Sequence, residues 1–150
     1  MDIRSGTSAS ALSNFSPRPF TFRGVECASM EGLLQSLKFK SPEMQIHVCT
    51  LVGKAAKFKG KNKKWWKEQT LWWQGEPIKR DSQEYQDLLD EAYEALYTQN
   101  QAARRALLAT GNAVLRHSIG KSDARRTVLT EQEFCSRLML IRNRLAKEEG

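Results

Sequence analysis

The fold is decided by the stretch SMEGLLQSLKFK, residues 29–40. At about 100° per residue, a helix gathers its apolar side chains into one sector. These are Met30, Leu33, Leu34 and Leu37. A second sector, about a quarter-turn away, holds Glu31, Gln35 and Lys38. A solvated polar face normally lies opposite the apolar one, but this polar stripe borders it. On periodicity alone, the pattern favours an ordinary amphipathic helix with charges at its edge. The alternative is a helix whose carboxylate, amide and ammonium groups line a pocket wall.

The residues before this helix predict a short β-hairpin. Residues 20–22 (FTF) and 25–27 (VEC) alternate apolar and polar side chains, and Arg23-Gly24 between them can turn. The hairpin leads to Ser29, which we expect to be the N-cap of the helix. Glu31 would then lie in the first turn, where the helix dipole favours an ionised carboxylate.

The N-terminal residues have a different composition. Residues 1–12 are rich in Ser, Ala, Gly and Thr and have no apolar run that could form a signal-peptide core. We expect them to form a flexible leader, followed by a single domain over residues 13–150. Residues 14–19 (NFSPRP) contain two prolines and side chains that can bond the local backbone, which favours an ordered loop.

Several further helices are predicted downstream. Ser41-Pro42 is a typical helix start, and the expected core face of that helix consists of Ile46, Cys49, Leu51 and Val52. Asp81 and Glu84 resemble a capping box, and Thr130 and Glu133 form a second one at the start of the last helix.

Between these caps, the pattern predicts a helix ending near residue 97 and a short helix over residues 102–109. Residues 114–117 look like a strand, and residues 118–126 like a polar loop. The predicted fold is α+β and predominantly helical, with about six helices and a small β element.

Composition sets the broad class of the protein. With 150 residues, 40% apolar and 27% charged, the chain is long enough for one globular domain with its own core. The three cysteines are Cys27, Cys49 and Cys135, an odd number without close spacing, which predicts neither a disulfide framework nor a zinc site. We therefore expect a cytoplasmic protein. The sequence has no run of eighteen apolar residues, so no association with a membrane is expected.

The positive charge is concentrated in one segment. Residues 54–67 contain seven lysines and no acid, and these seven lysines account for the whole net charge of +7. Such a patch suggests a phosphate or polyanion partner, including nucleic acid.

The basic segment is also aromatic, with Phe58, Trp65, Trp66, Trp72 and Trp73 in or beside it. Each tryptophan of the first pair lies seven residues from its counterpart in the second, which would place the pairs on one side of a helix. Either these rings belong mostly to the core, or they form a cationic, aromatic wall that stacks a base. We expect at least two of the tryptophans to be core.

The sequence lacks the commonest catalytic motifs. His47 and His117 are isolated, and neither a phosphate-binding loop nor a serine or cysteine nucleophile motif is present. A lone histidine such as His117 is more often a structural hydrogen-bonding group than a catalyst. What remains is a carboxylate, a lysine, an amide and a phosphate-seeking patch. By analogy with glycosidases, this set suits cleavage of an N-glycosidic bond of ribose, where positive charge develops on the sugar.

Short motifs in a common order resemble the NADAR or YbiA-like family. They cover residues 14–17 (NFSP), 29–31 (SME) with Gln35 and Lys38-Phe39, 107–111 (LLATG), 115–118 (LRHS) and 138–142 (LMLIR). The resemblance implies a YbiA-like domain. It also implies an N-glycoside hydrolase that acts on ADP-ribose linked to guanine, or on phosphoribosylated intermediates of riboflavin biosynthesis.

The resemblance assigns roles to particular residues. Glu31 corresponds to the helix glutamate of the family, a catalytic position. The implied substrate-binding residues are Asn14, Ser16, Gln35, Lys38, Phe39 and His117. The sequence departs from the family where H-Y-F is replaced by residues 32–34 (GLL) and where D-x-x-W-G is missing. Asp123 is the nearest acid that could replace the lost aspartate as a second catalytic residue, with Glu131 behind it. The family's mid-chain tryptophan could correspond to Trp66, Trp72 or Trp73, and none of these is assigned.

The leading hypothesis is a metal-independent N-glycosidase without a cofactor. ADP-ribosylated guanine is favoured slightly over riboflavin intermediates, because the lysines would attract a diphosphate or a nucleic-acid strand. The second hypothesis is a non-enzymatic module that binds ADP-ribose or nucleic acid through residues 54–73. A third is a structural protein, which would need neither a pocket nor clustered charge.

Overall fold

The computed structural model describes residues 1–4, 6–7 and 9–149. In chain order, its elements are η1 (Ser10–Leu12), β1 (Phe20–Phe22), β2 (Val25–Cys27), α1 (Met30–Ser36), α2 (Pro42–Cys49), α3 (Gly53–Lys61), η2 (Trp65–Lys67), β3 (Thr70–Trp73), β4 (Glu76–Lys79), α4 (Gln83–Gln99), α5 (Gln101–Leu108) and α6 (Glu131–Glu149). Helices dominate, and the strands form two separate two-stranded sheets. The prediction of a mainly helical α+β fold is confirmed.

Helix α1 forms where the two-stripe pattern predicts it, but it is shorter than the pattern. The Ser29 hydroxyl caps it by accepting the Gly32 N–H at 3.0 Å, as predicted. The apolar stripe is buried, with Leu33 and Leu37 fully inaccessible. The helix ends at Ser36 with Leu37 as its C-cap, so Lys38 follows the helix directly. Helix α1 packs against both α2 and α3.

Two β-hairpins flank this group of helices. The predicted hairpin is confirmed, with β1 and β2 antiparallel and Phe20 opposite Cys27. The second hairpin pairs β3 with β4, placing Thr70 opposite Lys79. Both turn dipeptides, Arg23-Gly24 and Gln74-Gly75, have positive φ at each residue. This is the backbone geometry of tight hairpin turns, which glycine adopts without strain.

The tryptophans divide between core and surface. Trp65 and Trp73 are each only 9% exposed, which confirms that at least two are core, whereas Trp66 is 45% exposed. The helical seven-residue relation between the pairs is wrong. Helix α3 ends at Lys61, and Trp65 lies in a 3-10 turn while Trp73 lies in a strand.

Helix α2 begins after Ser41 as predicted but faces the core differently. Ile46 and Val52, expected in the core, are 45% and 37% exposed. The buried residues are Gln45, Val48 and Cys49, which share a face at helical spacing. Gln45 belongs inside because its amide donates to the carbonyls of Ser36 and Trp72, at 3.1 and 2.8 Å.

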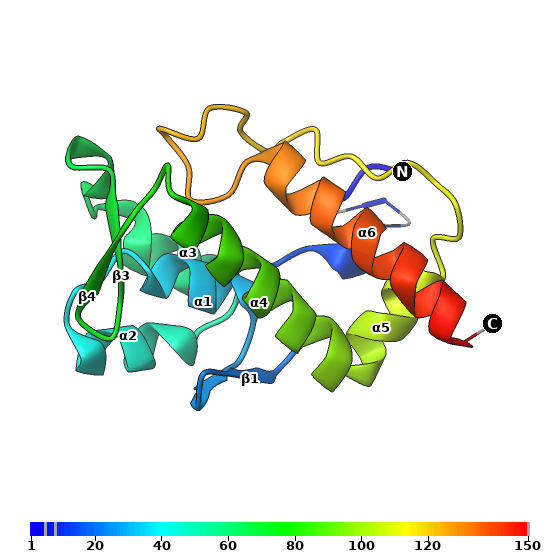
Figure 1. The fold of residues 1–150 in the computed structure, drawn as a ribbon, viewed down its shortest axis with the longest axis horizontal. Helices are drawn as coiled ribbons and strands as arrows, with labels where there is room; N and C mark the ends of the chain where they lie inside the picture. The colour runs from blue at the N-terminus through cyan, green and yellow to red at the C-terminus, as the bar shows by residue number, and fades with distance from the viewer. Residues whose placement is uncertain (5, 8, 150) are drawn as a thin grey trace.

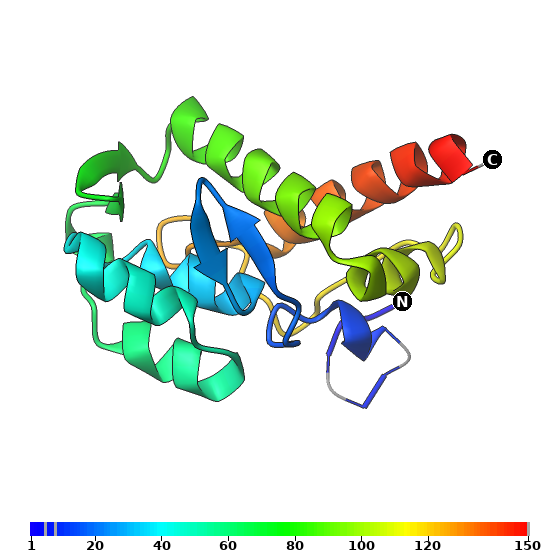
Figure 2. The same cartoon turned by 90° about the horizontal axis from the view of Figure 1, so that it is seen from below.

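The long helices α4 and α6 cover one side of the molecule, with α5 between them in the chain (Figures 1 and 2). Helix α4 is capped by Ser82, whose hydroxyl accepts the Tyr85 N–H at 3.1 Å, not by the predicted Asp81. The capping box of α6 is confirmed in both directions. Glu133 N–H donates to the Thr130 hydroxyl at 3.0 Å, and Thr130 N–H donates to the Glu133 carboxylate at 2.8 Å.

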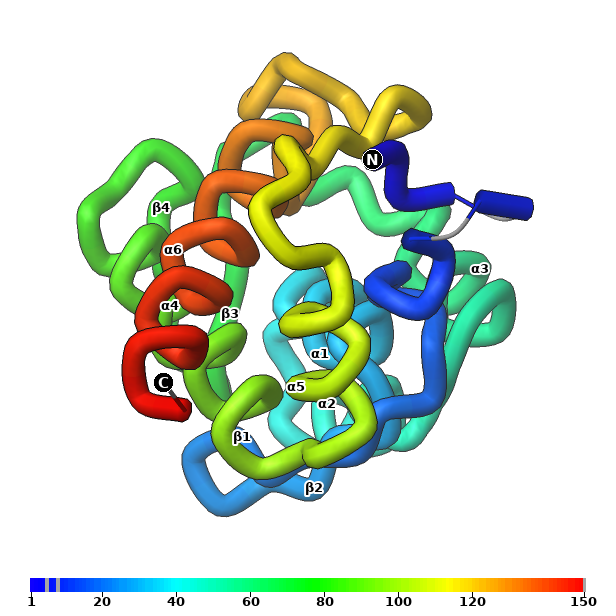
Figure 3. Tube along the Cα trace, turned by 90° about the vertical axis from the view of Figure 1, so that its right-hand side faces the viewer, coloured from blue at the N-terminus to red at the C-terminus, as the bar shows by residue number. Residues whose placement is uncertain are grey.

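The first residues are packed on the domain, where a flexible leader was expected. Ile3 N–H donates to the Arg116 carbonyl at 2.7 Å, and the Ile3 side chain is 1% exposed. Leu12 is buried as well. Figure 3 shows this segment beside the chain that follows α5. Ile3, Ala9 and Leu12 thus anchor the segment in the hydrophobic core.

The chain between α5 and α6 is mostly irregular. Of the strand expected over residues 114–117, only Arg116 pairs, in an isolated parallel bridge with Asp2. The described residues contain no helix with the length and apolar character needed to cross a membrane.

Candidate functional site

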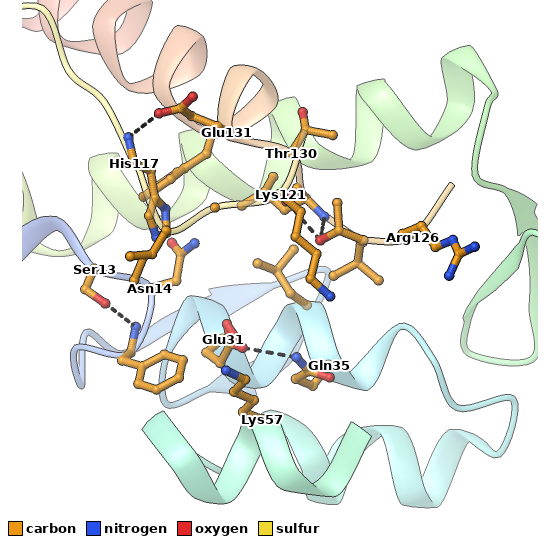
Figure 4. A pocket seen from close by; sticks show the side chains of 18 of the residues that line it. Ser13, Asn14, Glu31, Gln35, Lys57, His117, Lys121, Arg126, Thr130 and Glu131 are labelled. Carbon is orange, nitrogen blue, oxygen red and sulfur yellow. Dashed lines mark hydrogen bonds between the residues drawn. The ribbon is translucent and has the colours of Figure 1, made fainter. Parts of the chain in front are cut away.

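A cavity of about 540 Å³ lies between α1, α3 and the segment that joins α5 to α6. Figure 4 shows α1 with Glu31 and Gln35 on one side and residues of the joining segment, including His117 and Lys121, on the other. Residues 13–15 close a further wall. The polar stripe of α1 therefore lines a cavity, which was the alternative to an ordinary amphipathic helix.

Glu31 lies on the α1 wall of the cavity. Its backbone N–H donates to the Asn14 carbonyl at 3.0 Å, which ties the start of α1 to the loop before the first hairpin. Its carboxylate accepts a hydrogen bond from the Gln35 amide nitrogen at 3.0 Å. Burial raises the pKa of Glu31, and the Gln35 hydrogen bond and the charges of Lys38 and Lys57 only partly oppose this. The expectation that the helix dipole would favour ionisation is therefore wrong in its net sign, because desolvation is larger.

Lys38 also lines the cavity, and its pKa is shifted in the opposite direction to that of Glu31. Burial lowers the pKa of the Lys38 ammonium, the Glu31 charge raises it, and Lys121 lowers it further. The ammonium is 3.5 Å from the Gly60 carbonyl of α3. The neighbouring acid and base are thus both partly desolvated, which brings their pKa values toward one another.

Cations make up much of the remaining lining. They come from three parts of the chain and are Arg4, Lys57, Lys61, Lys63, Lys121 and Arg126. Trp65 and Trp66 provide an aromatic surface beside them. This arrangement of positive charge around the Glu31 carboxylate suits a ligand that has phosphates and a ring.

His117 and Glu131 lie on the side opposite α1. The His117 backbone N–H donates to the Glu131 carboxylate at 2.6 Å, and Arg116 holds the same carboxylate at 3.2 Å. These bonds lower the pKa of Glu131, with Arg116 as the largest cause. Burial lowers the pKa of His117, whose ring packs edge-on against Phe134 with centroids 5.4 Å apart. At neutral pH, the His117 imidazole is therefore neutral, and the Glu131 carboxylate is an anion already bound by Arg116 and the His117 backbone.

The structure gathers most of the predicted site residues. Asn14, Glu31, Gln35, Lys38 and His117 all line the cavity. Asn14 is held in place by the Tyr93 hydroxyl, which donates to its side-chain oxygen at 3.0 Å.

Three predicted residues lie elsewhere. Ser16 borders a second, much smaller hollow near Arg18. Phe39 is buried, with the Lys63 ammonium 4.9 Å from its ring centroid. Asp123 is exposed, and its carboxylate accepts the N–H of Arg125 within its own loop. Its carboxylate is not among the groups that face the cavity. Glu131, the acid behind it in sequence, is the one that reaches the lining.

The cavity also contains residues that the motifs did not indicate. Lys57, Lys61 and Lys63 belong to the basic segment, so its charge was a usable signal. Lys121 and Arg126 lie in an irregular loop, and nothing in the local sequence shows that this loop crosses the cavity. Over the described ranges of the chain, no three His, Cys, Asp or Glu side chains gather as a set of metal ligands would.

Comparisons with known proteins agree with this fold. The structure is similar to the NMR structure of the Escherichia coli protein YbiA, with a TM-score of 0.65 and 18% identity, over 99% of this chain and 89% of that one. The resemblance to the YbiA-like family is thus confirmed at the level of the fold. A 17.1 kDa protein of the Gp30–rIII intergenic region of enterobacteria phage T4 is 39% identical over 140 residues, covering 90% of each chain. The family model described as Bacteriophage protein GP30.3 matches residues 6–143. The chain has a YbiA-like fold and belongs to the bacteriophage GP30.3 protein family.

Proposed function

We propose that this protein is an N-glycoside hydrolase whose substrate contains a ribose phosphate. The observation that carries the proposal is the Glu31 carboxylate, which is partly buried on the wall of a large cavity and surrounded by cations. The resemblance to the YbiA-like family, whose members are understood as N-glycoside hydrolases, supports the same reaction class.

The reaction needs one negative charge close to the sugar. When the N-glycosidic bond breaks, the electron pair leaves with the base and the ribose ring becomes positively charged. An ionised carboxylate stabilises this charge or activates the water that attacks the sugar. Of the two carboxylates that line the cavity, Glu131 is held by Arg116 and the His117 backbone. We therefore assign the charge beside the sugar to Glu31.

The cations define the rest of the substrate. Lys57, Lys61 and Lys63 on one side and Lys121 and Arg126 on the other can neutralise phosphates. The cavity volume of about 540 Å³ falls within the range of small-molecule sites. ADP-ribose linked to guanine is our preferred substrate over phosphoribosylated riboflavin intermediates, because it brings a diphosphate for the cations and two bases for the exposed face of Trp66.

The direct test offers both substrate classes in parallel. Purified protein is incubated with ADP-ribosylated guanosine and with phosphoribosylated riboflavin intermediates, and released base or amine and free sugar phosphate are read by mass spectrometry. Release from the first alone supports our preferred substrate. Turnover should survive EDTA, because we propose a reaction that uses no metal; a loss that a divalent ion restores would contradict this part.

The same cavity would also suit a non-enzymatic binder of ADP-ribose. The two functions differ at Glu31. An enzyme with Glu31→Gln still binds but no longer turns over, whereas a binder is indifferent to this change. Binding without any product release in the wild-type protein would overturn the hydrolase proposal.

A further inference from the structure

The Glu31 carboxylate is held by a side chain that itself depends on a glycine of another helix. The Gln35 amide nitrogen donates to Glu31 at 3.0 Å, one helical turn along α1. The amide oxygen of Gln35 is buried and has no hydrogen-bond partner among the described residues. This oxygen instead lies against the backbone of α3 at Gly60. A Cβ built at Gly60 would lie 2.0 Å from this oxygen and 3.1 Å from the amide carbon.

Gly60 is therefore at the point where α3 crosses the polar stripe of α1. The same added Cβ would lie 3.2 Å from the Cδ atom of Lys38, so the bare glycine face also receives the stem of that side chain. Gly60 has no positive φ, so its backbone conformation does not explain the glycine. The need is for space, because with the Gln35 amide in this position only a hydrogen fits there.

This contact also fixes which end of the amide faces the carboxylate. The direction of the missing Cβ leads from the Gly60 Cα to the Gln35 oxygen, so the Cα–H of the glycine points at that oxygen, a weak but favourable contact. The opposite orientation would place an amide N–H₂ against the Cα–H and an amide oxygen against the Glu31 carboxylate. Both contacts would then be repulsive.

We propose that Gly60 is a positioning residue for Glu31: its missing side chain admits the Gln35 amide between α1 and α3, and that amide holds the carboxylate toward the cavity. The inference rests on the proposed function only for its catalytic consequence. The positioning itself is a property of the folded protein and can be measured without any substrate.

The test reads the pKa of Glu31 by carbon-detected NMR titration, with its signal assigned by its loss in Glu31→Gln. The charged groups that face Glu31 are Lys38 on its own side of the cavity and Lys57 on α3, with the Tyr93 hydroxyl on α4. None of the three is substituted in the variants, and Gln35→Met also leaves the contact between the Lys38 side chain and Gly60 intact. Gln35→Met keeps the length of the side chain but removes the donor, so the pKa of Glu31 should rise by about one pH unit. Gly60→Ala expels the same amide and should give a similar rise.

A double variant separates positioning from damage to the fold. Alanine ordinarily stabilises a helix relative to glycine, so a lower Tm in Gly60→Ala would report the collision. Gln35→Ala/Gly60→Ala removes the colliding atoms and should recover the Tm, while its Glu31 pKa stays at the raised value of Gln35→Ala alone. Lys59→Ala, an exposed change on α3 outside the cavity, should leave the pKa unmoved.

The outcomes distinguish this inference from the hydrolase proposal. An unchanged pKa of Glu31 in both Gln35→Met and Gly60→Ala overturns the positioning role, whatever the activity. A raised pKa in a protein that cleaves no N-glycoside leaves the positioning in place and overturns the function. If both hold, Gly60→Ala should lower kcat at a pH below the raised pKa with little change in KM.

Discussion

At the scale of single residues, the site is a competition between burial and charge at Glu31. Desolvation raises the pKa of this carboxyl, while Gln35, Lys38 and Lys57 act against it. A carboxylate with these neighbours remains able to ionise, and the proposed reaction would use its charge. A developing positive charge on ribose interacts most strongly with an anion that water does not screen.

The first prediction concerns the charge of Glu31. Glu31→Gln keeps the size of the side chain but removes the anion that the proposed transition state needs, so kcat should fall about a hundredfold to a thousandfold. KM should change little, because the loss falls on the transition state. Single-turnover kinetics would separate the two. Full activity in Glu31→Gln would show that Glu31 takes no part in the reaction.

The same substitution predicts a pH dependence of stability. A carboxyl whose pKa is raised on folding binds its proton more tightly in the folded state, so stability falls as pH rises from the unfolded value, about 4.3, through the folded one. Gln has no such titration. The Tm of Glu31→Gln should therefore match the wild type near pH 4 and exceed it at neutral pH. Thermal melts across this pH range would measure the difference. A Tm of Glu31→Gln below that of the wild type at neutral pH would show that the ionised carboxylate stabilises the fold.

Lys38 provides a prediction for the pH–rate profile. The wild-type rate should rise with ionisation of Glu31 and fall with deprotonation of Lys38, whose pKa burial lowers. Lys38→Met removes the alkaline limb. It also moves the acidic limb to higher pH, because the Glu31 anion loses a stabilising cation. An acidic limb that stays in place in Lys38→Met would show that these groups are not coupled.

At the scale of elements, the segment opposite α1 is held by an ion pair on its far side. The Arg80 guanidinium is 2% exposed and binds the Glu133 carboxylate at 2.6 and 3.0 Å. Its Nε donates to the Thr127 carbonyl at 2.9 Å, and the Tyr85 hydroxyl donates to the Val128 carbonyl. Burial acts to raise the pKa of Glu133, but hydrogen bonds from Arg80, Gln86 and the Thr130 N–H together lower it.

Breaking this pair should therefore be costly. Arg80→Met leaves the Glu133 charge buried without its partner, and we expect a loss of about 3–5 kcal/mol in the free energy of unfolding. Arg144→Met, which breaks an exposed pair with Glu94, is the control and should cost about 0–1 kcal/mol. Urea denaturation would compare the free energies of unfolding of the two variants.

Because the pKa of Glu133 is lowered on folding, the contribution of the pair is present above the unfolded pKa. The gap between Arg80→Met and wild type should thus narrow as pH falls through the folded pKa, and a gap that widens in acid would contradict this account.

These elements also show what the sequence could predict. Starts that depend on local side-chain bonds were recognisable, since Ser29 and the Thr130–Glu133 box act within a few residues. Near α4, two adjacent residues could cap, and Ser82 does so while Asp81 does not. The path of residues 117–130 depends on distant partners such as Arg80. That Lys121 lines the cavity and Asp123 does not could not be predicted from the loop sequence alone.

At the scale of the whole molecule, the fold divides one basic segment between two surfaces. Lys57, Lys61 and Lys63 line the cavity. The other four lysines of the segment do not, and they are Lys54, Lys59, Lys64 and Lys67. All four are exposed, and the Lys67 ammonium is 5.9 Å from the ring centroid of the exposed Trp66. The sequence could predict the patch but not its division, which depends on the direction in which α3 faces α1.

The division predicts that a small substrate and a nucleic-acid strand will respond differently to the outer lysines. For a single-stranded oligonucleotide, each phosphate neutralised contributes about 0.7 to the slope of log affinity against log salt. Lys54→Ala/Lys59→Ala should reduce this slope and weaken binding at low salt, while KM for a nucleotide-sized substrate stays the same because neither residue lines the cavity. Lys57→Ala/Lys61→Ala is the matched change on the same helix and should raise that KM as well.

Fluorescence anisotropy between about 50 and 200 mM salt would measure the affinity for the oligonucleotide, and steady-state kinetics would measure KM for the small substrate. If the affinity of the wild type for the oligonucleotide did not change with salt, the basic segment would act only in the cavity. If KM rose equally in the two double variants, its lysines would act as one undivided surface.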